Sequence, residues 1–274
     1  KVKVSGPLAL GTRVHAALEA FYNGNDLIES YMLFLEEDRI IAQREFLDIE
    51  ALNSEGEMGR IMLEGYIRWI EDEGIDAKYE IISNEETLSM PMLDGRVELR
   101  GKIDMRLRRL SDGTRLIRDF KTVGQTFQQY TSTLHLNEQA LTYMTLDAYH
   151  NSEEDRADGA LFTLFKKNKQ TAKASGPFYA EEEVLHNIFT LRSFWTRLNA
   201  VLSDMMAVKD ALDSGANHQG IAYPRPSNDC TWKCPFFNIC GMMDDGTDVE
   251  DAIKDLFDVG NPDERYEEDK KGVE

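Results

Sequence analysis

The sequence lacks several features that would assign it to common protein classes. It has no apolar run long enough to cross a bilayer, and no signal peptide is recognisable at its start. It contains no G-x-x-x-x-G-K-[ST] phosphate loop, which argues against a helicase motor within the chain. No internal repeat or low-complexity linker interrupts its 274 residues, a length that suits one large domain or two small ones.

Basic residues are in short supply. The chain has 31 Lys and Arg against 50 Asp and Glu, a formal net charge of −19, so its total charge does not suggest a nucleic-acid partner. Residues 244–274 hold thirteen acidic and four basic residues, a composition typical of a solvated surface. A local positive path for an anionic substrate is still expected from two basic clusters, Arg96, Arg100, Lys102, Arg106, Arg108 and Arg109 on one predicted strand and Lys166, Lys167, Lys169 and Lys173 in one loop.

Cysteines are few and confined to one short segment. Cys230, Cys234 and Cys240 have the spacing C-x₃-C-x₅-C. An odd count packed this tightly does not fit a disulfide framework and indicates a metal or cluster site in a reducing compartment. Thiolates suit Zn²⁺ or an iron–sulfur centre, and the alternative is a structural role as small buried apolar side chains.

Hydrophobic periodicity predicts an α/β protein. Helical spacing covers 8–22, 58–73, 137–150 and 181–212, and 27–52 is also expected to be helical. Alternating patterns predict strands over 78–92, 96–110 and 114–122, joined by Leu-Asp-Gly and Ser-Asp-Gly turns into an antiparallel meander. The apolar run 159–166 predicts a buried strand. We therefore expect one domain over 1–243, with its core at about 78–170, helical parts at 8–74 and 180–213, a cysteine segment at 221–243 and an acidic tail at 244–274.

Two neighbouring predicted strands each carry a carboxylate, although Asp is depleted in strands. Asp104 lies in Gly-Lys-Ile-Asp, and Asp119 lies in Asp-Phe-Lys. Because alternate strand residues share a face, Asp119 and Lys121 point the same way, and pairing around the turn brings Asp104 near them. Two such carboxylates repel unless a cation lies between them, which favours Mg²⁺ or Mn²⁺. The alternative is that both carboxylates pair with nearby arginines.

Five short segments resemble the motifs of the RecB-like exonuclease branch of the PD-(D/E)XK nuclease superfamily, which includes the CRISPR-associated RecB-like exonucleases. In chain order they are Gly11–His15 (G-x-x-x-H), Glu85, Gly101–Asp104 (G-x-x-D), Asp119–Lys121 (D-x-K) and Gln139–Tyr143 (Q-x-x-x-Y). Each motif alone is weak, but their shared order on the expected elements is specific. The resemblance implies a restriction-endonuclease-like α/β fold, a central mixed sheet flanked by helices with a C-terminal cysteine segment.

The resemblance also implies residue roles. His15, Asp104, Asp119 and the backbone carbonyl of Phe120 are expected to hold one or two Mg²⁺ or Mn²⁺ ions. Lys121 is expected to orient the attacking water and to offset charge on the phosphate. The alternative for His15 is an ordinary helix histidine.

Other residues are expected at the edge of this site. Gln139 and Tyr143 share one helical face, which suits contact with the nucleic-acid backbone or with Lys121, although they could simply fill a helix. Lys166 and Lys167 are expected to bind substrate. Glu19 and Glu85 are left open.

The resemblance implies a [4Fe–4S] cluster held by Cys230, Cys234, Cys240 and a cysteine upstream of the G-x-x-x-H motif. No cysteine precedes Gly11. Because the chain starts at Lys1 rather than Met, we expect the fourth ligand in a segment upstream. Without a fourth ligand, the thiols would hold a damaged cluster, zinc or nothing. His218 is a possible substitute, but its spacing from the cysteines does not favour it. The cluster is expected to be structural.

The expected function is that of a metal-dependent DNA exonuclease acting on single-stranded DNA or DNA ends. Its setting would be recombination, repair, phage DNA metabolism or CRISPR adaptation, in the cytoplasm of a prokaryote or of a phage-infected host. Expected partners are DNA and a helicase, annealing or CRISPR adaptation protein, with homo-oligomers allowed and no membrane. The alternatives are a catalytically silent iron–sulfur DNA-binding module, a nuclease subunit that is active only with its partner, and RNA as the substrate.

Overall fold

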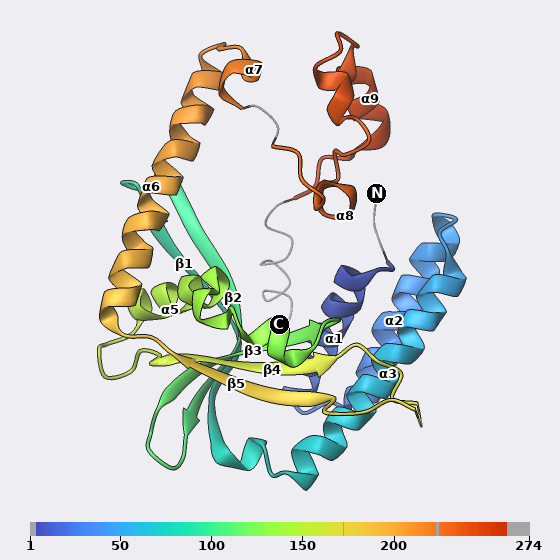
Figure 1. Cartoon of the computed structure of the whole chain (residues 1–274), viewed down its shortest axis with the longest axis vertical. Coiled ribbons are helices and arrows are strands. Elements are labelled where there is room, and N and C mark those ends of the chain that lie inside the picture. Colours follow the sequence, from blue (N-terminus) through green and yellow to red (C-terminus); the bar gives the residue numbers. More distant parts are fainter. Residues whose placement is uncertain (1–3, 172, 223–224, 262–274) are drawn as a thin grey trace, which may run out of the picture. The chain divides into compact units, whose positions relative to one another are not determined.

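The computed structural model describes residues 4–171, 173–222 and 225–261 (Figure 1). The chain divides into two compact units between Thr196 and Arg197, inside helix α6 (Ile188–Asp213). The larger unit precedes this division and holds the sheet and all the residues predicted to bind the catalytic metal. The domain boundary predicted at residue 243 stays a prediction.

A five-stranded mixed sheet forms the centre of the larger unit. Its strands lie in chain order and are β1 (Tyr79–Met92), β2 (Val97–Arg109), β3 (Arg115–Val123), β4 (Gly159–Lys166) and β5 (Tyr179–Leu185). Strands β3 and β4 run parallel, and the other neighbours are antiparallel. A parallel pair needs a long crossover. That crossover consists of α4 (Phe127–Thr131), the 3-10 turn η2 (Leu134–Leu136) and α5 (Glu138–His150).

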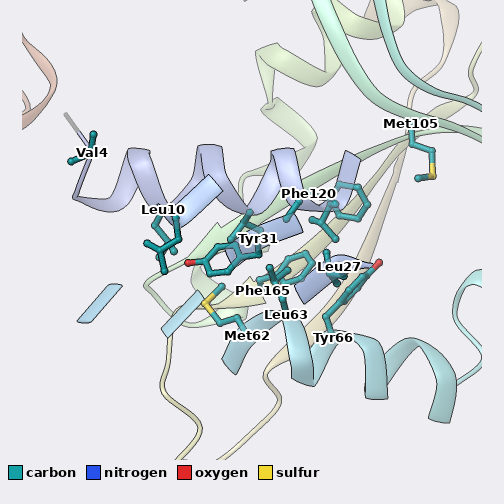
Figure 2. Close-up of a cluster of buried hydrophobic side chains, with 14 of the residues drawn as sticks. Val4, Leu10, Leu27, Tyr31, Met62, Leu63, Tyr66, Met105, Phe120 and Phe165 are labelled. Carbon is teal, nitrogen blue, oxygen red and sulfur yellow. The ribbon is translucent and has the colours of Figure 1, made fainter. Parts of the chain in front are cut away.

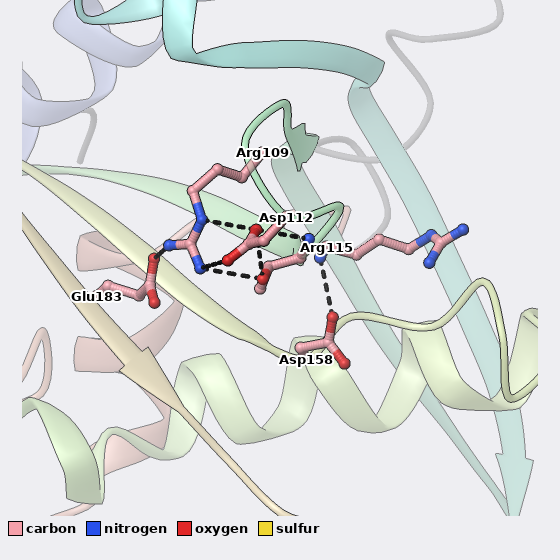
Figure 3. Close-up of polar contacts among 6 residues, drawn as sticks. Arg109, Asp112, Arg115, Asp158 and Glu183 are labelled. Atoms are coloured by element: carbon pink, nitrogen blue, oxygen red, sulfur yellow. Dashed lines mark hydrogen bonds and ion pairs between the residues drawn. The ribbon is translucent and has the colours of Figure 1, made fainter.

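The two predicted turns between β1, β2 and β3 are confirmed. At the first, Leu93, Asp94 and Gly95 have φ angles of 49°, 55° and 83°, the left-handed region that tight hairpin turns require. At the second, the Asp112 carboxylate accepts a hydrogen bond from the Thr114 backbone N–H at 3.1 Å. Arg109 then pairs with both Asp112 and Glu183 of β5, as Figure 3 shows, and so ties this turn to a strand distant in sequence.

Three helices cover one face of the sheet, namely α1 (Pro7–Tyr22), α2 (Leu27–Arg44) and α3 (Ile49–Asp72). Helix α1 packs on this face through Leu10, Val14 and Leu18, which are buried, and Phe21, which is partly buried. Figure 2 shows the helix residues Leu10, Tyr31 and Met62 in the same cluster as Phe120 and Phe165 of the sheet. The opposite face buries a smaller cluster that includes Ala140 of α5. The functional strands are therefore held from both sides.

Two predicted element boundaries are wrong. The helix predicted at 58–73 begins at Ile49, where Asp48 caps it by accepting a hydrogen bond from the Ala51 N–H. The stretch predicted as helical over 181–212 begins as a strand, because β5 pairs with β4 and α6 starts only at Ile188. Glu181 and Glu183 of β5 pair with arginines of the sheet. These ion pairs override the helical preference of glutamate.

The smaller unit is helical in its described part. After α6 it contains α7 (His218–Ile221), α8 (Cys230–Lys233), the 3-10 turn η3 (Cys240–Met243) and α9 (Val249–Leu256). Helix α9 belongs to the predicted acidic tail, whose remainder beyond residue 261 lies outside the described residues. Across the described part of the chain, no helix combines the length and the apolar character needed to cross a bilayer.

Candidate active site

The two predicted carboxylates stand where β2 and β3 part. The β2–β3 ladder ends at the pair Met105 and Arg118, and Asp104 and Asp119 lie just beyond it on the two strands. Asp104 Oδ2 accepts a hydrogen bond from the Phe120 backbone N–H at 3.0 Å. Because the N–H and C=O of a strand residue point to the same edge, the Phe120 carbonyl is also directed toward this gap. The predicted proximity of the two carboxylates is thus explained by register.

His15 reaches this gap from α1. Its Nδ1 lies 3.2 Å from Asp104 Oδ2, and its ring meets the Phe120 ring edge to face. Helix α1 lies against β3 at Gly11, where a Cβ atom would lie 3.6 Å from Oγ1 of Thr122. Burial disfavours both charges, yet the pair raises the pKa of His15 and lowers that of Asp104 from their ordinary values.

Lys121 and Asp119 point the same way, as the strand alternation predicts. Lys121 Nζ lies 2.7 Å from Asp119 Oδ2 and donates a hydrogen bond to Gln139 Oε1 at 2.7 Å. Gln139 in turn donates through Nε2 to the Tyr143 hydroxyl at 2.8 Å. Gln139 thus contacts Lys121 directly and Tyr143 contacts Gln139, and the roles of both residues at the site stay predictions.

Asp119 is 2% exposed, and its charge is only partly compensated. Lys121 Nζ lies 2.7 Å from Oδ2, and no other described side chain is paired with this oxygen. Burial, reinforced by the Asp104 charge and opposed by Lys121, raises the pKa of Asp119 to about 6. A buried carboxylate whose partial compensation comes from one ammonium is a position where a divalent cation would be favoured.

The ligand chemistry suits Mg²⁺ or Mn²⁺, which prefer oxygen ligands and keep several waters. Two carboxylates, one imidazole and one strand carbonyl face the gap. As the side chains stand, no three His, Cys, Asp or Glu of the described residues surround a common point. Instead His15 pairs with Asp104, and Lys121 covers Asp119. The residues therefore fit the ion chemically, and the ion would compete with these contacts.

A second row of charges lies beside Asp104. Lys102 Nζ lies 3.1 Å from Glu85 Oε2 and 3.3 Å from Glu19 Oε2. Glu19 follows His15 by one turn of α1, and the β1–β2 register sets Glu85 opposite Asp104. Burial, with the Asp104 and Glu19 charges, raises the pKa of Glu85 to about 7. Both glutamates, which the sequence leaves open, therefore lie next to the site.

Arg118 is a residue that the sequence analysis did not identify as a support of the site. The strand alternation could have indicated it, because Arg118 precedes Asp119 and therefore faces the opposite side of β3. Its side chain is 1% exposed, and its guanidinium donates to Asp76, Thr163 and Glu181 at 2.8, 2.9 and 2.8 Å. The guanidinium carbon lies 5.5 Å from the centre of the Phe120 ring. Arg118 thus supports the strand segment that carries Asp119 from behind.

The positive path expected along β2 is wrong for four of its arginines, because each is paired with an acidic side chain. These pairs are Arg100 with Glu98, Arg106 with the fully buried Asp147, Arg108 with Glu80, and Arg109 with Asp112 and Glu183. They neutralise the strand and tie it to its neighbours. Among the described residues, Asp104 pairs with His15 and Asp119 pairs with Lys121, which differs from the alternative that both carboxylates pair with arginines.

The basic loop after β4 borders a groove of about 660 Å³. Lys166 and Lys173 line it together with Phe127, Asn168 and Ser175, whereas Lys167 is not among its lining residues. Lys166 pairs with Val123 in the β3–β4 register, two residues beyond Lys121. The groove therefore begins at the end of the strand that carries the site.

The three cysteines are free thiols. Cys230 is half-buried and accepts a hydrogen bond from the Ser227 N–H at 3.4 Å, Cys234 is exposed, and Cys240 is half-buried. In the part of the chain that is described, they are not gathered with one another or with His, Asp or Glu around one point. The thiols thus do not fit a cluster as they stand, and the cluster stays a prediction from spacing.

Comparisons with protein-family models and with solved structures both found matches. A model of the PD-(D/E)XK nuclease superfamily matches residues 2–241. A solved structure described as "Crystal structure of SSO0001" is similar over 70% of this chain and 74% of that chain, with 15% sequence identity and a TM-score of 0.31. The comparison with curated proteins found no match.

Proposed function

The chain belongs to the PD-(D/E)XK nuclease superfamily, and we propose that it is a RecB-like DNA exonuclease acting on single-stranded DNA or DNA ends. Membership of the superfamily indicates a metal-dependent nuclease. The observation that carries the proposal is the meeting of His15, Asp104, Asp119 and Lys121 where β2 and β3 part. His15, Asp104 and the Asp119–Lys121 pair come from three elements, α1, β2 and β3, so the meeting of these three groups is not a consequence of sequence proximity.

Each residue has a role in this proposal. His15, Asp104, Asp119 and the Phe120 carbonyl would hold the divalent ion, which lowers the pKa of a bound water and stabilises charge on the phosphate. Lys121, which contacts Asp119 and Gln139, would orient the attacking water and offset charge on the scissile phosphate. Tyr143 fixes the Gln139 amide that positions this lysine.

The groove after β4 supports a single-stranded substrate. Proteins that bind single strands combine basic side chains that follow the backbone with aromatic side chains that stack on bases. Lys166, Lys173 and Phe127 supply both in one groove. Because the whole chain has a net charge of −19, a local basic groove would direct the anionic strand to this end of the sheet.

A catalytically silent DNA-binding module is the second candidate. Its support would be the cysteine spacing, which is independent of the carboxylates. The buried Asp119 argues against it, because burying a carboxylate without full compensation is costly and a pure binder gains nothing from it. Iron and sulfide analysis of anaerobically purified protein would test the [4Fe–4S] proposal, with zinc as the competing result. A cytoplasmic setting and a helicase, annealing or CRISPR adaptation partner belong to the same proposal.

The function is tested by degradation of end-labelled single-stranded DNA with Mg²⁺ or Mn²⁺. We expect Asp119→Ala and Lys121→Ala to reduce cleavage by roughly 100-fold or more, because each removes a group that acts on the developing charge. Asp213→Ala on α6 is the matched control, since this aspartate is exposed and pairs with Lys209 one turn earlier in the same helix. Near-normal cleavage by both site variants would refute the assignment. Faster degradation of labelled RNA would change the substrate.

A further inference from the structure

We propose that the Lys102 ammonium is a built-in cation that takes the place of a second metal ion, so that the site holds one divalent ion rather than two. The inference rests on the proposed function in one respect only. It assumes that His15, Asp104 and Asp119 hold the first ion. The evidence lies in the charges on the other side of Asp104.

Lys102 lies between two carboxylates that come from different elements. Its Nζ is 3.1 Å from Oε2 of Glu85 on β1 and 3.3 Å from Oε2 of Glu19 on α1. The Lys102 and Glu85 side chains are only 13% and 10% exposed, so this is not an ordinary solvated surface pair. One cation therefore serves two carboxylates at a single, largely buried point.

The same point has the chemistry of a divalent cation site. Mg²⁺ and Mn²⁺ are held by one or two carboxylates and keep water in the remaining positions. Glu19 and Glu85 supply two such groups. Asp104, a ligand of the first ion, lies on β2 between the two residues that pair with the neighbours of Glu85. Without Lys102 the three carboxylates would repel one another, which a divalent ion would relieve. With Lys102 present, a second ion would have to displace an ammonium already paired on both sides.

The local backbone also directs Glu85 to this point. Glu85 has a φ angle of 50°, a left-handed conformation that residues with a side chain seldom adopt within a strand. The regular pairs of the β1–β2 ladder stand on either side of it, Asn84 with Met105 and Glu86 with Ile103. The chain therefore departs from regular strand geometry at the residue whose carboxylate meets Lys102.

The proposal predicts a count of bound ions. We would titrate the full chain with Mn²⁺ in the absence of DNA and count sites by calorimetry and by the electron paramagnetic resonance of free Mn²⁺. The expected result is one Mn²⁺ per wild-type chain and two per Lys102→Met chain, because methionine keeps the length of the side chain and removes its charge. Lys102→Arg keeps the charge and should bind one. Glu19→Gln combined with Lys102→Met removes a ligand of the new site and should also bind one.

The outcomes separate this inference from the proposed nuclease. Two ions on the wild-type chain would overturn the inference, and this result needs no variant to fold. One ion on a Lys102→Met chain with an unchanged circular dichroism spectrum would also overturn it. If the wild-type chain binds one ion but degrades no DNA, the nuclease proposal fails and the inference stands. If it binds none, both fail.

Discussion

Removing the buried Arg118 guanidinium should destabilise the larger unit severely. This side chain is 1% exposed and pairs with Asp76 and Glu181 while donating to the Thr163 hydroxyl. Arg118→Ala would leave the Glu181 carboxylate and the fully buried Thr163 hydroxyl without this donor, whereas Asp76 would keep the hydrogen bond from the Tyr22 hydroxyl at 2.9 Å. Taking one partner from a buried ion pair typically costs about 3–5 kcal/mol, since the remaining charge is left uncompensated.

The expected size of the effect can be stated as a melting shift. For a unit of this size, each kcal/mol lowers Tm by roughly 2–4 °C, so we expect Tm to fall by roughly 10 °C. Urea unfolding followed by circular dichroism gives the free energy directly. Glu181→Gln and the double variant complete a cycle, and the guanidinium–carboxylate coupling should be about 1–3 kcal/mol.

Arg115→Ala is the matched control on the same strand. Its side chain is 30% exposed and lies 3.3 Å from the exposed Asp155, a surface pair that contributes about 0–1 kcal/mol. The backbone N–H of residue 115 would still donate to Asp158, the contact drawn in Figure 3. If Arg118→Ala cost no more than Arg115→Ala, the burial of this charge would not be what stabilises the strand.

Two further predictions concern the site. Gly101→Ala places a methyl group 2.8 Å from Leu146 Cδ1 and 3.0 Å from Tyr143 Cε1, so it should displace α5 and slow DNA cleavage. The Mn²⁺ affinity of this variant should change little. An unchanged cleavage rate would contradict the prediction. Mn²⁺ should bind more weakly as pH falls from about 8 to about 6, because protons compete for its ligands. Asp104 raises the pKa of His15, and burial raises the pKa of Asp119 to about 6. As the pH falls, His15 and Asp119 therefore take up protons that the ion must displace. A calorimetric affinity independent of pH would exclude His15 and Asp119 as ligands.

The sequence was sufficient to predict the strands of the site because their alternation is a local property. Asp119 and Lys121 had to share a face once a strand was assigned, and the turn chemistry placed Asp104 on the neighbouring strand. Gly101 illustrates what local reasoning leaves out. Its motif could be recognised, but the reason for a glycine appears only when α5 is packed, since a Cβ there would meet Tyr143.

Elements that depend on distant partners could not be predicted in this way. The segment that contains Glu181 and Glu183 has a helical composition, yet it forms β5. Its backbone pairs with β4, and its two glutamates form ion pairs with Arg118 and Arg109 of the sheet. The arginines of β2 were likewise read as a free positive surface. Their acidic partners lie as far away in sequence as Asp147 and Glu183, so the neutralisation is visible only in three dimensions.

Strand β3 packs in the apolar core on one face and carries the charged residues of the site on the other. Phe120 packs in the aromatic core and stacks on Tyr22 with ring centres 5.9 Å apart, while its N–H donates to Asp104. Asp119, the residue before it, is buried, and its Oδ2 lies 2.7 Å from Lys121 Nζ. Of the described cations, Lys121 is the one that contacts this oxygen, so a divalent ion bound at Asp119 would compete with the Lys121 ammonium. Arg118 supports the strand from the opposite face, and this rigid packing is what would hold the ligands in place.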